Sequence, residues 1–216
     1  MFTRPRLTRV LTVAAVLATL LVSTIGASAQ LTVKGDQAAW AEIAAAYKKL
    51  YALSGFRMKL VAPEGQPSMV TEMVPPNSFH TMMEMAAGSA SGSGSMEIIS
   101  VGGQGRYRVN MPGAPAKWMC QGGPPVQAPS DPSAVQGTVE AARGPDTAID
   151  GTPVHAYIYT STISAQGQSV VVKTTLYVGA QTGLPRRAIN SVAGHESMID
   201  YYDYGAKLDI ALPPCG

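Results

Sequence analysis

The clearest hydrophobic pattern in this chain lies in residues 36–53 and predicts a helix. Asp36 is a suitable N-cap residue, and good helix formers follow it. Lys48 and Lys49 stand near the negative end of the helix dipole, and Gly55 is a termination signal. Apolar residues recur at three- and four-residue spacing, so the helix should bury one stripe. That stripe is made of Trp40, Ile43, Tyr47, Leu50 and Tyr51.

After this helix the hydrophobic period changes to two, which predicts β-strands. The alternation is clear in residues 56–60, 68–74 and 79–85, with turns at the Pro-containing segments 63–65 and 75–77. Shorter segments of the same kind are residues 96–101, 106–110 and 117–120.

The C-terminal half has the pattern of a β-meander. Strands are expected at residues 154–163, 170–178, 186–192 and 197–204, with a short last strand near 208–212. Tight turns such as Thr182–Gly183 separate them, so neighbouring strands should pair antiparallel. Residues 133–143 are ambiguous, because they fit either a short helix capped by Asp131 or a strand from Thr138. With about ten strands in total, the sheet must curl or be covered.

The first thirty residues have the features of a secretory signal peptide. A basic head precedes an apolar run over Val10–Ile25, and the small residues Ala27, Ser28 and Ala29 follow as a cleavage site. The run is interrupted and short for a membrane span, although an uncleaved N-terminal anchor is the alternative. The next residue is Gln30 rather than Cys, so the site offers no thiol for lipid attachment. A soluble periplasmic or secreted protein is therefore expected.

Cleavage would divide the chain into a signal peptide, residues 1–29, and a single domain, residues 30–216. That length can close a core without a metal. Inside the domain, residues 86–95 are nearly all Ala, Gly and Ser. Such a segment buries too little surface to offset its ordering entropy, so a flexible loop is expected there.

Charge excludes some partners and cysteine content suggests a covalent link. Charged residues make up 14% of the chain and the net charge is +2, with several of the cations in the leader. Neither the basic footprint of a nucleic-acid-binding protein nor a polybasic membrane patch is present.

In an oxidising compartment the two cysteines, Cys120 and Cys215, should form a disulfide, and two free buried thiols are the alternative.

Several short motifs give the chain a family resemblance. They are Val74-Pro75-Pro76-Asn77-Ser78-Phe79, Leu176-Tyr177-Val178, Thr182-Gly183-Leu184-Pro185-Arg186, Asp200-Tyr201-Tyr202-Asp203-Tyr204-Gly205 and Ile210-Ala211-Leu212-Pro213. With the signal peptide and the helix, they resemble the periplasmic lipoprotein-carrier superfamily, which includes the outer-membrane lipoprotein chaperone and the mycobacterial lipid-carrying lipoproteins. The mycobacterial members are lipidated, and this chain departs from them because it lacks the required Cys.

The resemblance implies an α+β, mainly β fold. The expected architecture is a strongly curved antiparallel sheet, an incomplete β-barrel, with the N-terminal helix packed against its concave face. Such half-barrels hold acyl chains in an apolar interior. The unusual richness in methionine fits this, because Met adapts to variable apolar partners, but Met also fills ordinary cores. The expected lining residues are Trp40, Ile43, Tyr47, Leu50, Met58, Met69, Met73, Phe79 and Met83.

No catalytic constellation is evident in the sequence. His80, His155 and His195 lack metal-ligand spacing, and there is no nucleophile elbow, so neither an enzyme nor a metal or other cofactor is expected. The carboxylates of the Tyr-rich segment 200–209 could form a cation or sugar site, but alternation splits them between two faces. Arg186 and Arg187 could meet a phosphate headgroup, with a solvated pair as the alternative.

Three functions are therefore considered, and they differ in what each requires of the interior of the half-barrel. A carrier of a lipid or lipoprotein acyl chain needs a connected apolar cavity beneath the helix. A structural or interaction module of the cell envelope, which would bind an envelope protein, needs a core at normal packing density. A hydrolase ranks last, for want of a triad or metal cluster.

Overall fold

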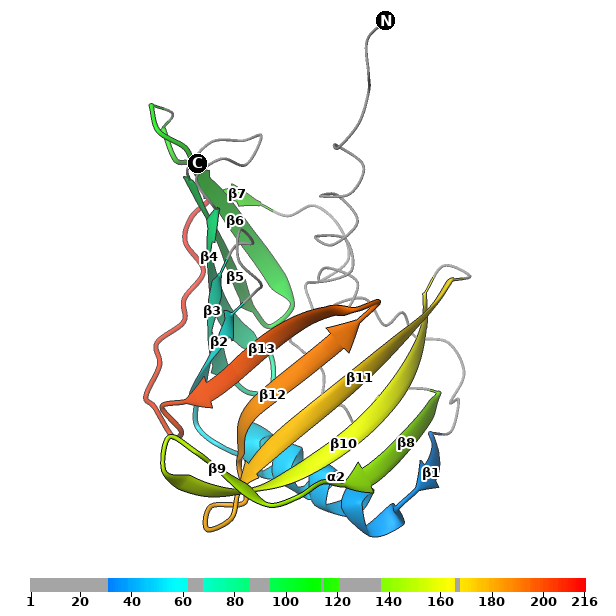
Figure 1. Cartoon of the computed structure of the whole chain (residues 1–216). Coiled ribbons are helices and arrows are strands. Elements are labelled where there is room, and N and C mark those ends of the chain that lie inside the picture. Colours follow the sequence, from blue (N-terminus) through cyan, green and yellow to red (C-terminus); the bar gives the residue numbers. More distant parts are fainter. Residues whose placement is uncertain (1–30, 62–67, 86–93, 114, 121–136, 166–167) are drawn as a thin grey trace, which may run out of the picture.

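The computed structural model describes residues 31–61, 68–85, 94–113, 115–120, 137–165 and 168–216. Within these residues the chain forms one helix, α2 (Gln37–Tyr51), and a 13-stranded sheet (Figure 1). The strands are β1 (Thr32–Gly35), β2 (Phe56–Val61), β3 (Met69–Val74), β4 (Ser78–Met85), β5 (Gly94–Val101), β6 (Gln104–Asn110), β7 (Met119–Cys120), β8 (Thr138–Arg143), β9 (Thr147–Ile149), β10 (Thr152–Ala165), β11 (Gln168–Gly179), β12 (Pro185–Val192) and β13 (His195–Tyr202).

The sheet is curved and open. Its strand order is β1-β8-β10-β11-β12-β13-β2-β3-β4-β5-β6-β7, and β9 pairs with the start of β10. The sheet bends at the β13–β2 junction, so that two walls stand at a steep angle to each other (Figure 1). We call β8 and β10–β13 the helix wall and β2–β6 the methionine wall. The path ends at β1 and β7, which do not meet, so the mainly β half-barrel expected from the sequence is confirmed.

One strand pair departs from the expected antiparallel pattern. β1 and β8 pair parallel, with Thr32 opposite Thr138 and Gly35 opposite Ala141. The four residues of β1 are too few to show an alternation, so no local pattern indicates this edge strand. β8 also decides the ambiguity at residues 133–143 in favour of a strand from Thr138, within the part of that range that the structure describes.

The helix starts as predicted but ends differently. Asp36 Oδ1 accepts hydrogen bonds from the backbone N–H groups of Ala38 (2.9 Å) and Ala39 (3.0 Å). The last helical residue is Tyr51, and the C-cap is Ala52 rather than Gly55. A Cβ at Gly55 would lie 2.6 Å from the carbonyl oxygen of Ala206, so this glycine is required by the close approach of the C-terminal tail.

The helix lies on the concave side of the sheet and closes the core there (Figure 1). Trp40 packs edge-on against Tyr159 of β10 with ring centroids 6.0 Å apart, and Tyr51 packs edge-on against Phe56 of β2 at 5.9 Å. The predicted stripe is confirmed, because Trp40, Ile43, Tyr47 and Leu50 are buried, while Tyr51 is half-buried against the same core.

The C-terminal tail, residues 203–216, pairs with no strand, so the short strand expected near 208–212 is wrong. It runs beside the methionine wall towards β7 (Figure 1) and is held at its two ends instead. At one end the N–H of Gly205 donates to the carbonyl of Gly55 at 2.8 Å. At the other, Cys215 forms the predicted disulfide with Cys120, with Cα atoms 5.7 Å apart.

Two sequence expectations fall largely outside the described residues. The signal peptide, residues 1–29, is one of them. The loop expected at residues 86–95 is the other, although its last two residues, Gly94 and Ser95, begin β5. Among the helices that the structure describes, none is long and apolar enough to cross a membrane.

Candidate apolar ligand site

The concave face of the methionine wall carries three rows of side chains that run across the strands. The antiparallel register sets these rows, since residues opposite each other point to the same side. The first row is Phe56, Met73, Phe79 and Ser100. The second row is Met58, Thr71, Thr81, Ile98 and Tyr107. The third row is Leu60, Met69, Met83, Met96 and Val109.

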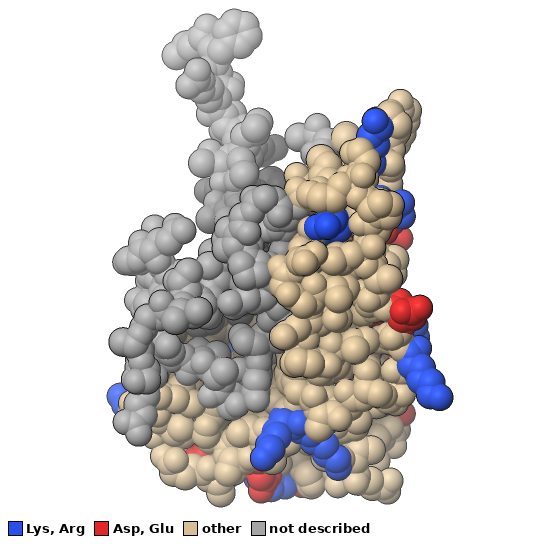
Figure 2. Space-filling model, turned by 180° about the vertical axis from the view of Figure 1, so that it is seen from behind, with Lys and Arg blue, Asp and Glu red and all other residues tan. Residues whose placement is uncertain are grey.

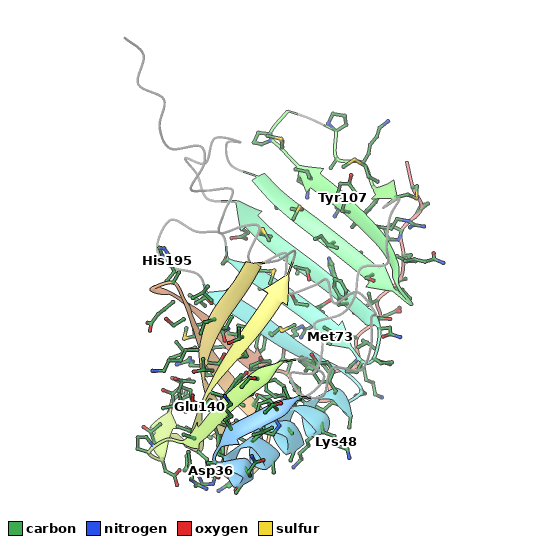
Figure 3. All side chains as sticks on the ribbon, turned by 90° about the vertical axis from the view of Figure 1, so that its right-hand side faces the viewer. Asp36, Lys48, Met73, Tyr107, Glu140 and His195 are labelled. Carbon is green, nitrogen blue, oxygen red and sulfur yellow. A yellow bond between two sulfur atoms is a disulfide. The ribbon has the colours of Figure 1, made fainter. Side chains whose placement is uncertain are left out.

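Burial falls from the first row to the third. In the first row Phe56, Met73 and Ser100 have no exposed surface, and Phe79 is 4% exposed. In the third row Leu60 is buried, but Met69, Met83, Met96 and Val109 are only half-buried. Met73 lies toward the end of this wall that faces the helix, whereas Tyr107 lies farther away (Figure 3). The wall therefore passes from a closed core into a half-exposed apolar surface.

The second row contains a satisfied polar pair. The hydroxyls of Thr71 and Thr81 are 3.0 Å apart and both side chains are buried. Because the two hydroxyls are hydrogen-bonded to each other, neither needs a hydrogen bond from water or from a polar group of a ligand. Half-buried Met58, Ile98 and Tyr107 flank it, so the row remains mainly apolar.

The nine lining residues expected from the sequence divide into two groups. Six lie in the closed core: Trp40, Ile43, Tyr47, Leu50, Met73 and Phe79. Met58, Met69 and Met83 are half-buried on the concave face of the methionine wall. Only the second group is partly exposed.

The lining residues expected from the sequence omit several members of the same surface, although Met96 belongs to the methionine-rich part of the chain. Met96, Ile98, Tyr107 and Val109 complete the second and third rows from β5 and β6. Their alternation with Glu97 and Arg108 was a usable signal. It identified the strands, but the register that joins them to Met69 and Met83 is a long-range property.

A buried tyrosine cluster joins the helix to the helix wall. Tyr47 of the helix is hydrogen-bonded to Tyr159 of β10 and Tyr201 of β13 through their side chains. Burial raises the pKa of all three hydroxyls, so they stay neutral and can donate hydrogen bonds. Next to them, Thr174 donates to the side-chain oxygen of Asn190 at 2.8 Å. The cluster fixes the helix in place across two strands.

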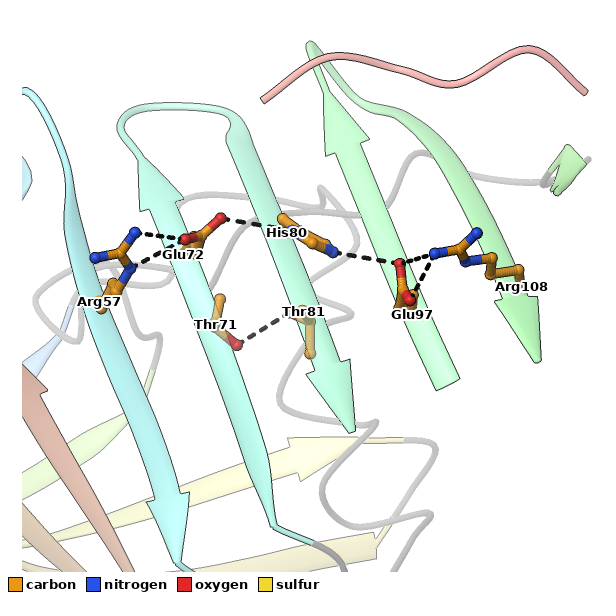
Figure 4. Close-up of polar contacts among 7 residues, drawn as sticks. All are labelled: Arg57, Thr71, Glu72, His80, Thr81, Glu97 and Arg108. Carbon is orange, nitrogen blue, oxygen red and sulfur yellow. Dashed lines mark hydrogen bonds and ion pairs between the residues drawn. The ribbon is translucent and has the colours of Figure 1, made fainter. Parts of the chain in front are cut away.

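The opposite face of the methionine wall is charged. Arg57, Glu72, His80, Glu97 and Arg108 form a ladder across all five strands (Figure 4). Its tightest contacts are Arg57–Glu72 and Arg108–Glu97, both 2.8 Å, while His80 lies 3.5 Å from Glu72 and 3.6 Å from Glu97. The wall therefore has one apolar and one ionic face, and Met82, 40% exposed, stands on the ionic side.

Arginine and histidine groups elsewhere are also in ion pairs. Arg57 contacts Asp203 at 2.7 Å, and His155 Nδ1 lies 3.0 Å from Asp146. Asp200 binds Arg187, so the carboxylates considered for a cation or sugar site are partly taken up by arginines. Among the described residues no group of three or more His, Cys, Asp or Glu side chains could hold a metal ion.

Seen from behind, the described surface is uncharged across its middle (Figure 2). Lys and Arg side chains stand at its top and bottom, and acidic and basic side chains follow its right-hand margin in that view.

Comparison with known proteins identifies the fold. No family model matches the chain, and no curated protein matches its sequence. Among solved structures, LprF from Mycobacterium bovis aligns with a TM-score of 0.57 at 11% identity, over 85% of this chain and 100% of LprF. The Mycobacterium tuberculosis lipoprotein LppX aligns with a TM-score of 0.52 at 13% identity, over 82% of this chain and 100% of LppX. The chain therefore has the fold of LprF and LppX, as the sequence motifs suggested.

Proposed function

We propose that this protein binds a lipid or a lipoprotein acyl chain on the concave face of the methionine wall. The observation that carries the proposal is the half-buried third row, Met69, Met83, Met96 and Val109, which continues directly from a closed core. Apolar side chains that stay partly exposed next to one another can mark a binding surface.

The chemistry of the row favours a flexible apolar ligand. Three of its half-buried members are methionines, whose unbranched thioether side chains repack around partners of different shape. Each methylene group of an acyl chain that leaves water contributes about 0.8 kcal/mol. After the costs of association and ordering, an affinity in the micromolar range is expected.

The half-barrel fold shared with LprF and LppX supports the same function, because half-barrels of the superfamily that the sequence resembles hold acyl chains in their interior. The N-terminal pattern supports export: we take residues 1–29 as a cleaved signal peptide and residues 30–216 as one soluble periplasmic or secreted domain. An acyl chain carried by a lipoprotein would make that lipoprotein the envelope partner.

A titration with a fluorescent fatty acid tests the proposal, and β4 supplies a matched pair of variants. Met83 and Met82 are neighbours in sequence but stand on the apolar and ionic faces of the same strand. Met83→Glu places a charge in the binding surface and should weaken binding by at least roughly tenfold. Met82→Glu should bind as the unaltered protein does. Circular dichroism verifies that both variants are folded.

Ile43→Asp is a less informative variant, because Ile43 has no exposed surface and a buried charge there should unfold the protein. If no long-chain lipid binds the folded protein saturably, the proposal is wrong. A non-catalytic envelope module with a filled core then becomes the better explanation.

A further inference from the structure

A hollow lies on the opposite face of the sheet from the three rows of the methionine wall. It has a volume of about 250 Å³ and lies over β2, β13 and the start of β12, next to the turn after β9. Figure 1 shows β9 at the same end of the sheet as the end of β13 and the start of β12. The lining residues that carry charge are Lys59, Asp150, Arg186, Arg187 and Asp200.

The charges of this hollow are not balanced. Arg187 and Asp200 neutralise each other through two hydrogen bonds, of 2.5 and 3.1 Å. Within the described part of the chain, the one ion-pair partner of Arg186 is Asp150, at 3.8 Å, and the Asp150 side chain is 72% exposed. Lys59 has no ion-pair partner among the residues that the structure describes. Two cations thus face the hollow with little or no compensation.

Their positions suit an anion between them. Lys59 comes from β2 and Arg186 from β12, and β13 lies between these two strands in the sheet. A ligand in the hollow could therefore meet a positive charge from each side. The Nε of Arg186 is buried and, like those of Arg106 and Arg108, has no hydrogen-bond acceptor among the described residues, so it can donate to an oxyanion. The phenol of Tyr202 adds a neutral donor to the wall.

We propose that this hollow is a phosphate-binding site, in which Lys59 and Arg186 hold the oxyanion against the fixed Arg187–Asp200 pair. Phosphate is favoured because its tetrahedral oxygens accept from cations on different sides, and Arg matches such oxygens well. The site takes either inorganic phosphate or the phosphate of a lipid headgroup. It lies on the opposite face from the acyl surface, so it goes beyond the function proposed above and does not depend on it.

Asp150 is the natural competitor of the bound anion. Its backbone has φ +48°, a left-handed conformation that Asn also tolerates. Asp150→Asn therefore removes one negative charge without altering the turn. It should tighten phosphate binding by roughly two- to fivefold, a gain that general damage to the fold cannot produce.

The test is an NMR titration of the mature protein with inorganic phosphate, against sodium chloride at the same ionic strength. Saturable shifts should appear around residues 59, 186 and 202. Lys59→Gln and Arg186→Gln should each weaken binding by roughly three- to tenfold, as expected for loss of one charge-assisted contact. Lys173→Gln, an exposed lysine of β11 that does not line the hollow, is the control and should leave binding unchanged.

A second arm distinguishes the source of the phosphate. Vesicles of phosphatidylglycerol and of phosphatidylcholine are sedimented with the protein and its variants. Vesicle binding that is lost in Lys59→Gln assigns the site to a headgroup, and phosphate binding without vesicle binding assigns it to the free ion. The proposal is overturned if phosphate causes no more shift than chloride, or if all four variants titrate alike. Fatty-acid binding is measured separately, so failure of the phosphate site leaves the acyl site untouched.

Discussion

The helix wall and the methionine wall differ in what covers their concave faces. On the helix wall, Val139, Tyr157, Tyr159, Leu176 and Ala188 are all buried in the same core as the stripe of α2. On the methionine wall, the closed core takes in the first row, through contacts such as Tyr51–Phe56, and half-buried Met58 and Ile98 of the second row pack against it. Both walls alternate apolar and polar residues, so alternation alone does not decide which surface is closed. The position of helix α2 decides which of the two concave faces is closed.

The two walls also differ in how they are stabilised. The helix wall is held by apolar packing and by the buried tyrosine cluster. The methionine wall has a smaller share of buried core, and it has the ion-pair ladder on its outer face and the disulfide at its β7 edge. A region that keeps an apolar surface available for a ligand needs such supports elsewhere.

The largest expected effect concerns the disulfide, which ties the C-terminal tail to the β7 edge of the methionine wall. The bond closes a separation of 95 residues, for which the chain-entropy model allows about 4–5 kcal/mol. Cys215→Ser should lower the free energy of unfolding by roughly 2–4 kcal/mol under oxidising conditions, measured by urea denaturation. After reduction, the variant and the unaltered protein should unfold alike. A variant as stable as the oxidised parent would show that the tail contributes nothing to this wall.

Substitutions of two methionines on the same concave face compare the stability of the first row with that of the third. Met73 has no exposed surface, whereas Met83 is half-buried. Met73→Ala should leave a cavity and cost roughly 2–4 kcal/mol, while Met83→Ala should cost about 1 kcal/mol or less. Equal losses in urea denaturation would mean that the third row is as closed as the first, which would rule out an accessible acyl surface there.

The smallest expected effect is the pH dependence of the stability that the ion-pair ladder contributes through Glu97. Burial alone would raise the pKa of Glu97, but hydrogen bonds and charge from Arg108 and His80 outweigh it and hold the pKa below the ordinary value of 4.5. A carboxyl with a lowered folded-state pKa stabilises the protein above its unfolded-state pKa, and this stability is lost as pH falls through the folded-state value.

Glu97→Gln therefore removes about 1 kcal/mol near pH 7. The difference between the variant and the parent should shrink as the pH falls below about 4.5. Glu196→Gln, at an exposed residue of β13, is the control. Denaturation curves from pH 7 to about pH 3 measure the difference. A difference that stays constant over that range would show that Glu97 does not stabilise the ladder through its charge.

Local patterns predicted much of this fold. Asp36 as N-cap, the helix stripe and the alternation in β2–β4 and β10–β13 depend on neighbouring residues, and all were found. The disulfide was predictable because only two cysteines are present. These features need no knowledge of distant contacts.

The predictions from the sequence that were wrong or incomplete concern features that long-range contacts determine. Gly55 is required by a tail about 150 residues later in the chain, near Ala206, and no local signal shows that approach. The tail at 208–212 alternates like a strand but finds no strand partner. Similarly, the sequence could nominate Met58, Met69 and Met73 together, but only the position of the helix separates buried Met73 from half-buried Met69.

The central claim, that the third row of the methionine wall meets an acyl chain, is tested most directly by cross-linking with a photoreactive fatty acid. The adducts are located by mass spectrometry of proteolytic fragments. We expect adducts on the concave residues Met69, Met83 and Met96, and none on Val70 or Met82, their neighbours on the outer face. Adducts distributed equally over both faces, or confined to the outer face, would contradict the claim.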